Sequence, residues 1–287
     1  MNRNDFRLLH RLRVRWVEVD LQKIVFNGHY LMYFDTAMAD YWRALAVPYE
    51  DTMQQLGGDL YVKKASLEYH ASAQYDDMLE VGLRCQRIGN SSIQFVGGIF
   101  SGDQLLITSE LLYVYANPQT KTSMPVPPVL RETMLGFEAG EAVTTLETGS
   151  WAHLKDKAMP VRMQVFVQEQ GVDAQYELDE MDEGAVHAVI TNRFGQPLGT
   201  ARLFEKSPGV AQIGRMAVVR AIRGSGLGSQ LLHALVEMAQ MRGDKEVRLH
   251  AQCSAQAFYA RAGFVPVGEP FDEVGIAHIE MCKELAK

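Results

Sequence analysis

Apolar and polar positions follow two different patterns along this chain of 287 residues. Residues 8–17 alternate apolar side chains with arginines, which predicts a strand with one wet face. Beyond residue 30, apolar side chains recur at three- and four-residue steps, which predicts a long helix with a wide apolar face. The helix is followed by four segments with the pattern of strands, at about 61–70, 79–88, 92–101 and 104–115.

The second half of the chain has a different order of elements. Apolar β-branched segments separated by turns predict three antiparallel strands, at 186–191, 198–204 and 211–219. A helix then carries Leu231, Leu232, Leu235 and Met238 at helical spacing, and a strand over 247–251 follows. Small and acidic residues over 136–150 interrupt both patterns, and a chain of this length favours two domains. We therefore expect an α+β protein with domains at 1–138 and 145–287.

A glycine-rich segment joins the strand that ends near Val219 to the following helix. Its sequence is Arg223-Gly224-Ser225-Gly226-Leu227-Gly228. Glycines let a backbone approach a pyrophosphate closely, and the N-H groups and dipole at a helix N-terminus favour an anion. The Lys-Ser or Lys-Thr pair of a P-loop is absent, and the glycine spacing differs from that of a Rossmann fingerprint. The segment therefore predicts an anion site for a phosphate-bearing cofactor.

The Arg-x-x-Gly-x-Gly spacing resembles the coenzyme A loop of the GNAT N-acetyltransferase superfamily, and the later segment 258–264, Phe-Tyr-Ala-Arg-Ala-Gly-Phe, resembles a second motif of that superfamily. The resemblance covers the chain from about Thr145 onward. It implies an amine acceptor and acetyl-CoA as the acetyl donor, with Tyr259 giving a proton to the departing thiolate. The residues it implies for coenzyme A are Met216, Ala217 and Val218 for pantetheine, Arg223, Gly224, Ser225, Gly226, Leu227, Gly228 and Ser229 for pyrophosphate, and Gln252 in place of a frequent asparagine.

The general base of such a transfer stays open at the level of sequence. Histidines lie on or beside predicted strands, where an imidazole can titrate near neutral pH. Acidic residues also precede the first long strand of this half. The candidates are His187, His250, His278, Glu169, Glu177, Asp179, Glu180, Asp182 and Glu183.

The first half resembles the hotdog acyl-CoA thioesterases of the 4-hydroxybenzoyl-CoA type over residues 8–134. Asp20, Asn27 and Tyr30 match the signature ahead of the long helix, while Lys23 replaces the usual glycine. The resemblance implies that Asp20 attacks the thioester or activates water, and that N-H groups near Asn27 stabilise an oxyanion. Glycine at position 23 would permit an unusual backbone angle, so lysine there is a departure that bears on catalysis.

Composition narrows the possible partners. The net charge of −7 is divided evenly between the halves, so neither is basic enough to predict a nucleic-acid partner. The three cysteines are isolated, which indicates neither a disulfide framework nor a metal site. No apolar run suits a membrane span or a secretory leader, so we expect a cytoplasmic protein without a membrane or metal partner.

The combined interpretation is a bifunctional protein that acts on coenzyme A esters. We expect acetyl transfer to an amine by the second half and thioester hydrolysis by the first. Related thioesterases build active sites across a dimer interface, which implies a homodimer or tetramer through the hotdog half. Two alternatives remain: the hotdog half serves only for dimerisation, or the protein is a non-catalytic acyl-CoA sensor.

Overall fold

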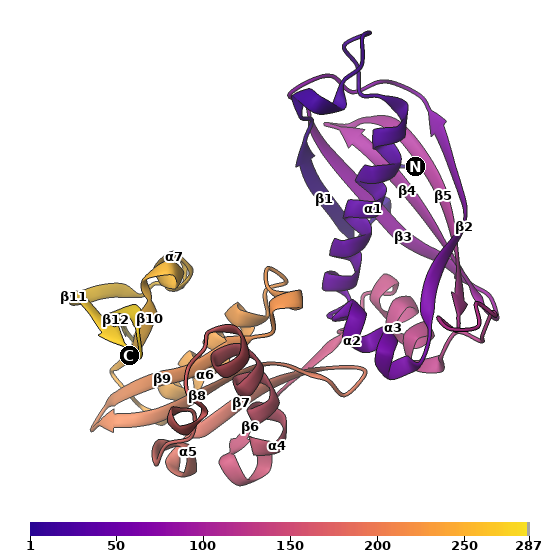
Figure 1. Cartoon of the computed structure of the whole chain (residues 1–287). Coiled ribbons are helices and arrows are strands. Elements are labelled where there is room, and N and C mark those ends of the chain that lie inside the picture. Colours follow the sequence, from indigo (N-terminus) through magenta and orange to yellow (C-terminus); the bar gives the residue numbers. More distant parts are fainter. Residues whose placement is uncertain (286–287) are drawn as a thin grey trace. The chain divides into compact units, whose positions relative to one another are not determined.

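A computed structural model describes residues 1–285 of the chain. It divides into two compact units, Met1–Val143 and a second unit that starts at Thr144. The two units are described separately below (Figure 1).

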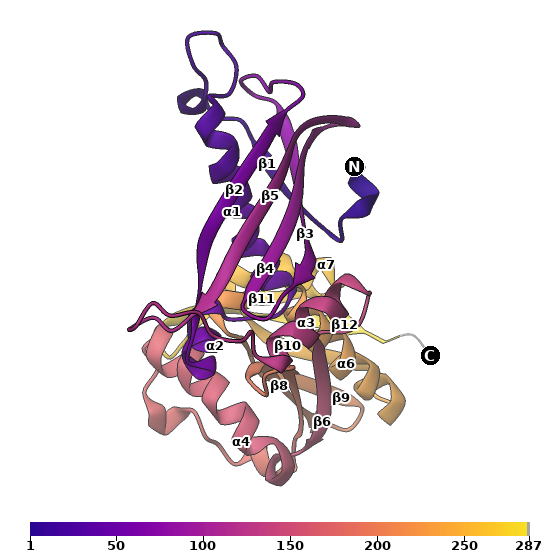
Figure 2. The ribbon, with the colours of Figure 1, turned by 90° about the vertical axis from the view of Figure 1, so that its right-hand side faces the viewer.

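The first unit is one antiparallel sheet with a long helix along one of its faces (Figures 1 and 2). The strand order is β1-β3-β4-β5-β2. The sheet is a meander from β3 to β5, with β1 and β2 on its two edges. The elements are β1 (Leu8–Arg13), α1 (Asn27–Ala44), α2 (Tyr49–Leu56), β2 (Asp59–Tyr69), β3 (Met78–Ile88), β4 (Ser92–Ser101), β5 (Gln104–Ala116) and α3 (Pro128–Glu138), with short 3-10 turns η1 (Arg3–Asp5) and η2 (Trp16–Glu18).

Aromatic side chains on one face of α1 form the core of this unit. Tyr41 is fully buried and meets Phe95 of β4 edge to face, with ring centroids 5.2 Å apart. A Cβ at Gly97 would overlap the ring of Phe34, so glycine lets α1 approach β4 closely. Burying several aromatic rings removes a large apolar area from water and fixes the helix on the sheet.

Two segments of the first unit differ from the expectation. The strand expected over 8–17 ends at Arg13, because Val14 turns inward and its N-H is bonded to Asp77 O, and η2 follows. Helix α2 was not expected. Its sequence is mostly polar, and only Thr52 and Met53 are buried.

The second unit is a seven-stranded sheet in the order β11-β12-β10-β9-β8-β7-β6. All neighbouring strands are antiparallel except β9 and β10, which run parallel. The strands are β6 (Thr144–Ser150), β7 (Val186–Asn192), β8 (Pro197–Ser207), β9 (Val210–Val218), β10 (Glu246–Gln252), β11 (Val265–Glu273) and β12 (Ile276–Glu284). The helices are α4 (Trp151–Arg162), the π-helical turn η3 (Met163–Glu169), η4 (Ala174–Tyr176), α5 (Met181–Gly184), η5 (Arg220–Ile222), α6 (Leu227–Arg242), η6 (Cys253–Ala255) and α7 (Gln256–Arg261).

Helices α4 and α6 cover opposite faces of this sheet. Leu154 and Ala158 of α4 pack on Val189, whereas a Cβ at Gly199 would meet Leu231 of α6. Val189 and Ile190 are successive residues of β7, and Ile190 pairs with Gly199. Because successive strand residues point to opposite faces, the two helices lie on different sides.

Strands β9 and β10 are paired only at their first halves. Their register runs from Glu246 opposite Val210 to Leu249 opposite Ile213, and no further pair follows along β9 among the described residues. Arg215 has a left-handed φ of 50° just beyond the last pair, which bends β9 away. The two strands therefore part toward their carboxyl ends, as Figure 1 shows between the orange β9 and the yellow β10.

Candidate functional site

The glycine-rich segment lies at the N-terminus of α6, directly after β9 and η5. Gly224 and Gly226 have φ values of 88° and 89°, a left-handed conformation that glycine adopts without strain. Ideal Cβ atoms at both positions would meet open space. No side chain caps the first turn of α6. The first N-H groups of the helix are thus available to an anion, together with the positive end of its dipole.

A cavity of about 450 Å³ lies in front of this segment, and we call it the loop cavity. Its wall contains most of the residues that the sequence predicted for coenzyme A. Ser225 and Gln252 are the exceptions, and the hydroxyl of Ser225 donates to Ile222 O. The lining residues are Met216, Ala217, Val218, Ile222, Arg223, Gly224, Gly226, Leu227, Gly228, Ser229, Ala255, Phe258, Tyr259 and Arg261.

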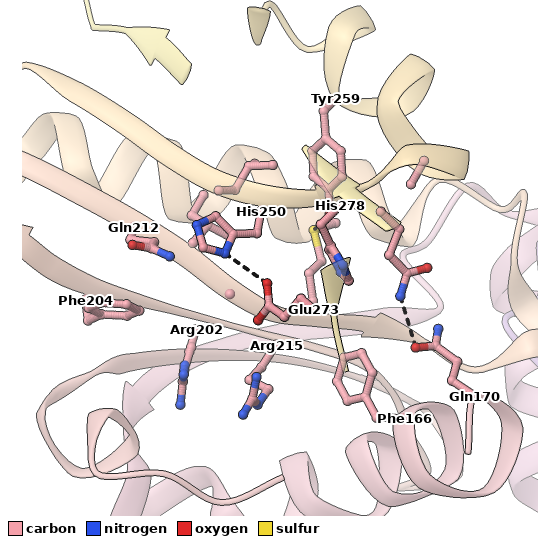
Figure 3. A pocket seen from close by; sticks show the side chains of 16 residues that line it. Phe166, Gln170, Arg202, Phe204, Gln212, Arg215, His250, Tyr259, Glu273 and His278 are labelled. Carbon is pink, nitrogen blue, oxygen red and sulfur yellow. Dashed lines mark hydrogen bonds and ion pairs between the residues drawn. The ribbon is translucent and has the colours of Figure 1, made fainter. Parts of the chain in front are cut away.

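A second cavity, of about 230 Å³, lies where β9 and β10 part, and we call it the strand cavity (Figure 3). Met216, Ala255 and Tyr259 line both cavities, so the two meet at these side chains. Gln252, predicted as a coenzyme A contact, lines the strand cavity and donates to Gln170 Oε1 at 3.0 Å.

Tyr259 lies at the junction of the two cavities. Its hydroxyl is 3.7 Å from the sulfur of Met216. Burial raises the pKa of Tyr259 to about 12, because the phenolate is poorly solvated there. The hydroxyl therefore keeps its proton at neutral pH and can donate it.

Arg223 already has a partner in this structure. Its two terminal nitrogens bind both carboxylate oxygens of Glu169, at 2.6 and 2.7 Å, and its Nε donates to Val218 O. The hydrogen bond from Arg223 lowers the pKa of Glu169. An anion in the loop cavity would have to compete with Glu169 for this guanidinium group.

Three arginines and three carboxylates form a network beside the strand cavity. Arg162 is fully buried and binds Glu177 and Asp182. Two further arginines join this network: Arg202 binds Asp179 and Asp182, while Arg215 binds Asp179 and the carbonyl groups of Tyr176 and Glu177. This network fixes the segment 174–184 on the sheet.

Six of the nine candidate bases fall into two groups in the structure. Asp179, Asp182 and Glu177 are engaged by arginines, and the imidazole of His187 is buried against Asp182 O. Arginines occupy the three carboxylates, the Nε2-H of His187 donates to a carbonyl oxygen, and none of these four residues lines the strand cavity. His250 and His278 both line the strand cavity.

Several cavity residues were not predicted from sequence. They lie in η3 and directly after it, in β8 and β9, and at the end of β11, and these elements are far from one another in sequence. The π-helical turn η3 itself indicates a functional site, because such turns occur frequently at functional sites. No sequence pattern predicted this turn. These residues are Phe166, Gln170, Arg202, Phe204, Gln212, Arg215 and Glu273.

In the first unit, Asp20 begins a tight turn before α1. Its carboxylate accepts from the N-H of Gln22, and its carbonyl accepts from the N-H of Lys23. Lys23 has a φ of 64°, in the left-handed region that favours glycine. Asn27 is the first residue of α1 and is exposed. The turn thus adopts the backbone that glycine would allow, with a lysine in the strained position.

Next to this turn, Glu18 is buried between Arg15 and Tyr33. Both donate to its carboxylate, at 2.8 Å each. Burial acts to raise the pKa of Glu18, but these hydrogen bonds outweigh it and lower the pKa. This charge anchors η2 to α1 and was not recognised from sequence.

Within residues 1–285 no helix is both long and apolar enough to cross a bilayer. The same residues contain no cluster of three or more His, Cys, Asp or Glu side chains arranged for a metal ion.

Two family models match the chain, one in each unit. The Thioesterase superfamily model matches residues 22–108, and the Acetyltransferase (GNAT) domain model matches residues 152–285. Both resemblances found in the sequence are therefore confirmed, as is the α+β fold class with a hotdog unit followed by a GNAT unit.

Individual proteins are similar to one or the other half of the chain. The uncharacterized N-acetyltransferase YjcF of Bacillus subtilis (strain 168) is 34% identical over 132 residues, which are 46% of this chain and 92% of that protein. An acyl-CoA N-acyltransferase structure from Pseudomonas aeruginosa is 34% identical and covers 49% of this chain and 99% of its own, with a TM-score of 0.45. A DHNA-CoA thioesterase structure from Staphylococcus aureus is 20% identical and covers 47% of this chain and 95% of its own, with a TM-score of 0.42.

The loop cavity, the parted strands, the two family models and the similarity to YjcF lead to one assignment. The chain is an enzyme that belongs to the GNAT acetyltransferase family through its second unit and carries a thioesterase superfamily domain in its first.

Proposed function

We propose that the second unit transfers an acetyl group from acetyl-CoA to an amine. The observation that carries this proposal is the meeting of two cavities at Met216 and Tyr259. One cavity has the uncapped helix N-terminus and glycine backbone that suit a pyrophosphate. The other is open for an acceptor, so donor and acceptor would meet where the strands part.

The loop cavity supports binding of the donor. The first N-H groups of α6 would bind the pyrophosphate, with Gly224 and Gly226 allowing close approach. Residues 216–218 lie beyond the last pair of β9 with β10, so their backbone groups on that side have no strand partner in the described register. The amides of pantetheine would form hydrogen bonds with these groups. The thioester would then lie next to Tyr259.

Tyr259 would supply the proton that the departing thiolate needs. Its pKa of about 12 keeps the hydroxyl protonated throughout the physiological range. The acceptor would lie in the strand cavity, whose volume of about 230 Å³ is below the usual range for drug-sized ligands. The acceptor is therefore a small amine, or a larger molecule that inserts only its amine end.

A combined binding and turnover measurement on the full chain tests this function. Calorimetry should detect acetyl-CoA, and mass spectrometry should detect acetylated amines from a mixed panel. Tyr259→Phe should retain acetyl-CoA affinity and lose about 10²-fold or more in kcat, since general acid catalysis contributes 10²–10⁴-fold. Lack of acetyl-CoA binding by the wild type would exclude the proposal.

The first unit supports a second function, hydrolysis of an acyl-CoA thioester. The specific observation is the left-handed turn at Lys23, which keeps the backbone course expected of the glycine it replaces. Asp20 would attack the thioester carbonyl or activate water, and the N-H groups at the start of α1 near Asn27 would stabilise the oxyanion.

We also propose that this unit forms a homodimer or tetramer. Large apolar side chains around the Asp20 turn are exposed, which is typical of an interaction surface. They are Trp16, Val17, Leu21, Phe26, Leu31 and Met32.

Hydrolysis and assembly are tested separately. A panel of acyl-CoA esters should show turnover that Asp20→Asn abolishes without loss of the dimer in light scattering. Dimers without any hydrolysis would favour the alternative that the hotdog half serves only for dimerisation. Binding of acyl-CoA without turnover at either site would favour a non-catalytic acyl-CoA sensor.

A further inference from the structure

In the strand cavity the imidazole of His250, one of the candidate bases, is paired with the carboxylate of Glu273. His250 Nδ1 lies 3.0 Å from Glu273 Oε2 (Figure 3). His250 is in β10 and Glu273 ends β11, and both line the cavity together with Tyr259. A carboxylate at Nδ1 makes that nitrogen the protonated one, so Nε2 keeps its lone pair.

The lone pair of His250 is available to a ligand. No hydrogen bond joins Nε2 to any residue in the described part of the chain. The ring is held by Phe271, which meets it edge to face with centroids 5.0 Å apart. The hydrogen bond from His250 lowers the pKa of Glu273, so the carboxylate is charged at neutral pH.

His278 is a natural comparison, because it lines the same cavity. Its Nδ1 is 2.8 Å from the carbonyl oxygen of Ile276, and its ring stacks on Phe271. A neutral carbonyl stabilises a positive imidazolium much less than a carboxylate does. Of the two imidazoles, His250 is therefore the one that a carboxylate orients for proton transfer.

The charges around the cavity favour a cationic acceptor. Arg162, Arg202 and Arg215 are balanced by the three carboxylates of their own network. Glu273 lies outside that network and adds a negative charge. An ammonium group is attracted to such a site, and it must lose a proton before its nitrogen can attack.

We propose that the acceptor is a basic aliphatic amine and that His250 is its general base, held in place by Glu273; this rests on the proposed transferase function. His250 Nε2 takes a proton from the ammonium group. The nitrogen lone pair then forms the C–N bond, and the C–S bond breaks with its electron pair on sulfur. Tyr259 protonates the thiolate, the second amine proton restores the tyrosine hydroxyl, and the imidazolium releases its proton to water.

The test compares acceptors that differ in their need for a base. Full-length protein with acetyl-CoA is offered methylamine, cyclohexylamine, spermidine and lysine, which are ammonium ions near neutral pH, and aniline, which is uncharged. His250→Gln should lower kcat/KM for the alkylamines by 10²-fold or more. The same variant should change the rate with aniline by less than about threefold, since aniline is uncharged and needs no deprotonation before its nitrogen attacks.

His233→Gln, at an exposed position of α6 that lines neither cavity, is the matched control and should leave both kinds of acceptor within about threefold of the wild type. Equal losses with alkylamines and aniline in His250→Gln would mean a structural role. Full alkylamine activity in that variant, or a wild type that acetylates aniline but no alkylamine, would overturn the proposal while leaving the transferase intact. Absence of acetyl-CoA binding would instead remove the transferase function itself.

A pH profile tests the positioning role of Glu273. The base must be uncharged to accept a proton, so kcat/KM should rise with pH to a plateau. Glu273→Gln removes the charge that stabilises the imidazolium, so this limb should move to lower pH and the plateau should fall. Glu273→Asp should restore part of the shift in pH and part of the plateau. A rising limb at unchanged pH in Glu273→Gln would contradict the pairing. The charged or titratable groups that face His250 from the packed elements are Arg202, Arg215, Tyr259, Glu273, His278 and Glu280.

Discussion

Lys23 is a residue in a backbone conformation that its side chain disfavours. Its φ of 64° costs a non-glycine residue roughly 1 kcal/mol or more. Replacement by glycine would remove this strain, but glycine loses more conformational entropy on folding, which offsets part of the gain in stability. We expect Lys23→Gly to raise the free energy of unfolding of the first unit by about 0.5 kcal/mol.

Urea unfolding monitored by tryptophan fluorescence measures this change. Lys64→Gly provides the comparison, because residue 64 lies within β2 and should lose stability by about 0.5–1 kcal/mol. If glycine at 23 also restores or increases thioester hydrolysis, the lysine limits catalysis as well as stability. A destabilised Lys23→Gly variant would contradict the strain argument.

The ion pair between Arg223 and Glu169 gives a second prediction for single residues. Glu169 holds the guanidinium that a pyrophosphate would use, at 2.6 Å. Glu169→Gln should therefore tighten coenzyme A binding, by about twofold to fivefold for a half-exposed pair. Arg223→Gln should weaken it and reduce its dependence on salt. Calorimetry at two salt concentrations measures both, and weaker binding in Glu169→Gln would show that the carboxylate assists the ligand.

At the scale of elements, segment 174–184 depends on charge for its position. Burial acts to raise the pKa of Asp182, but hydrogen bonds from Arg162 and Arg202 outweigh it and lower the pKa to about 2. A depressed carboxyl pKa adds stability above the unfolded value of 3.8, and this is lost as pH falls through the folded value.

The melting temperature of the second unit should therefore fall steeply between about pH 4 and pH 2, with Asp182 alone contributing on the order of 2 kcal/mol. Differential scanning calorimetry across this range measures the effect. Asp182→Asn should flatten the dependence on pH while lowering stability at pH 7. An unchanged slope in that variant would assign the acid sensitivity to other carboxylates.

The elements that were predictable from sequence are those with a strong hydrophobic period. Strand β4 has the bounds expected from its pattern, and the loop before α6 was recognisable because its residues are consecutive. Helix α2 was not, since its buried face is only Thr52 and Met53.

Long-range pairs were beyond the sequence for a physical reason. His250 and Glu273 lie 23 residues apart and meet only because β12 pairs with both β10 and β11. The register of those strands decides which side chains face the same cavity, and no local pattern specifies it. The partner of Arg223 was missed likewise, because η3 is 54 residues away from the loop.

At the scale of the whole molecule, two units that each suit coenzyme A esters predict two binding sites per chain. Calorimetric titration of the full chain with coenzyme A should give a stoichiometry of two. Gly226→Ala should remove or weaken one site, because its φ of 89° strains any side chain there. Gly243→Ala, with a φ of 90° at the other end of α6, is the matched control and should keep both sites.

A stoichiometry of one that Gly226→Ala abolishes would leave the first unit without a coenzyme A site. Each unit is compact by itself, so residues 1–143 and 144–287 should also unfold as separate cooperative transitions. One merged transition in the full chain would show that the two units stabilise each other.

Met216 forms part of the wall common to the two cavities of the second unit. The end of a transferred acyl chain would lie against this wall, so the length of chain that fits depends on the size of residue 216. The thioether is flexible and unbranched, and it can adapt to small differences in shape. One side chain on β9 would thus select among donors by the length of their acyl chain. The backbone that binds the nucleotide common to all these donors would have no part in that selection.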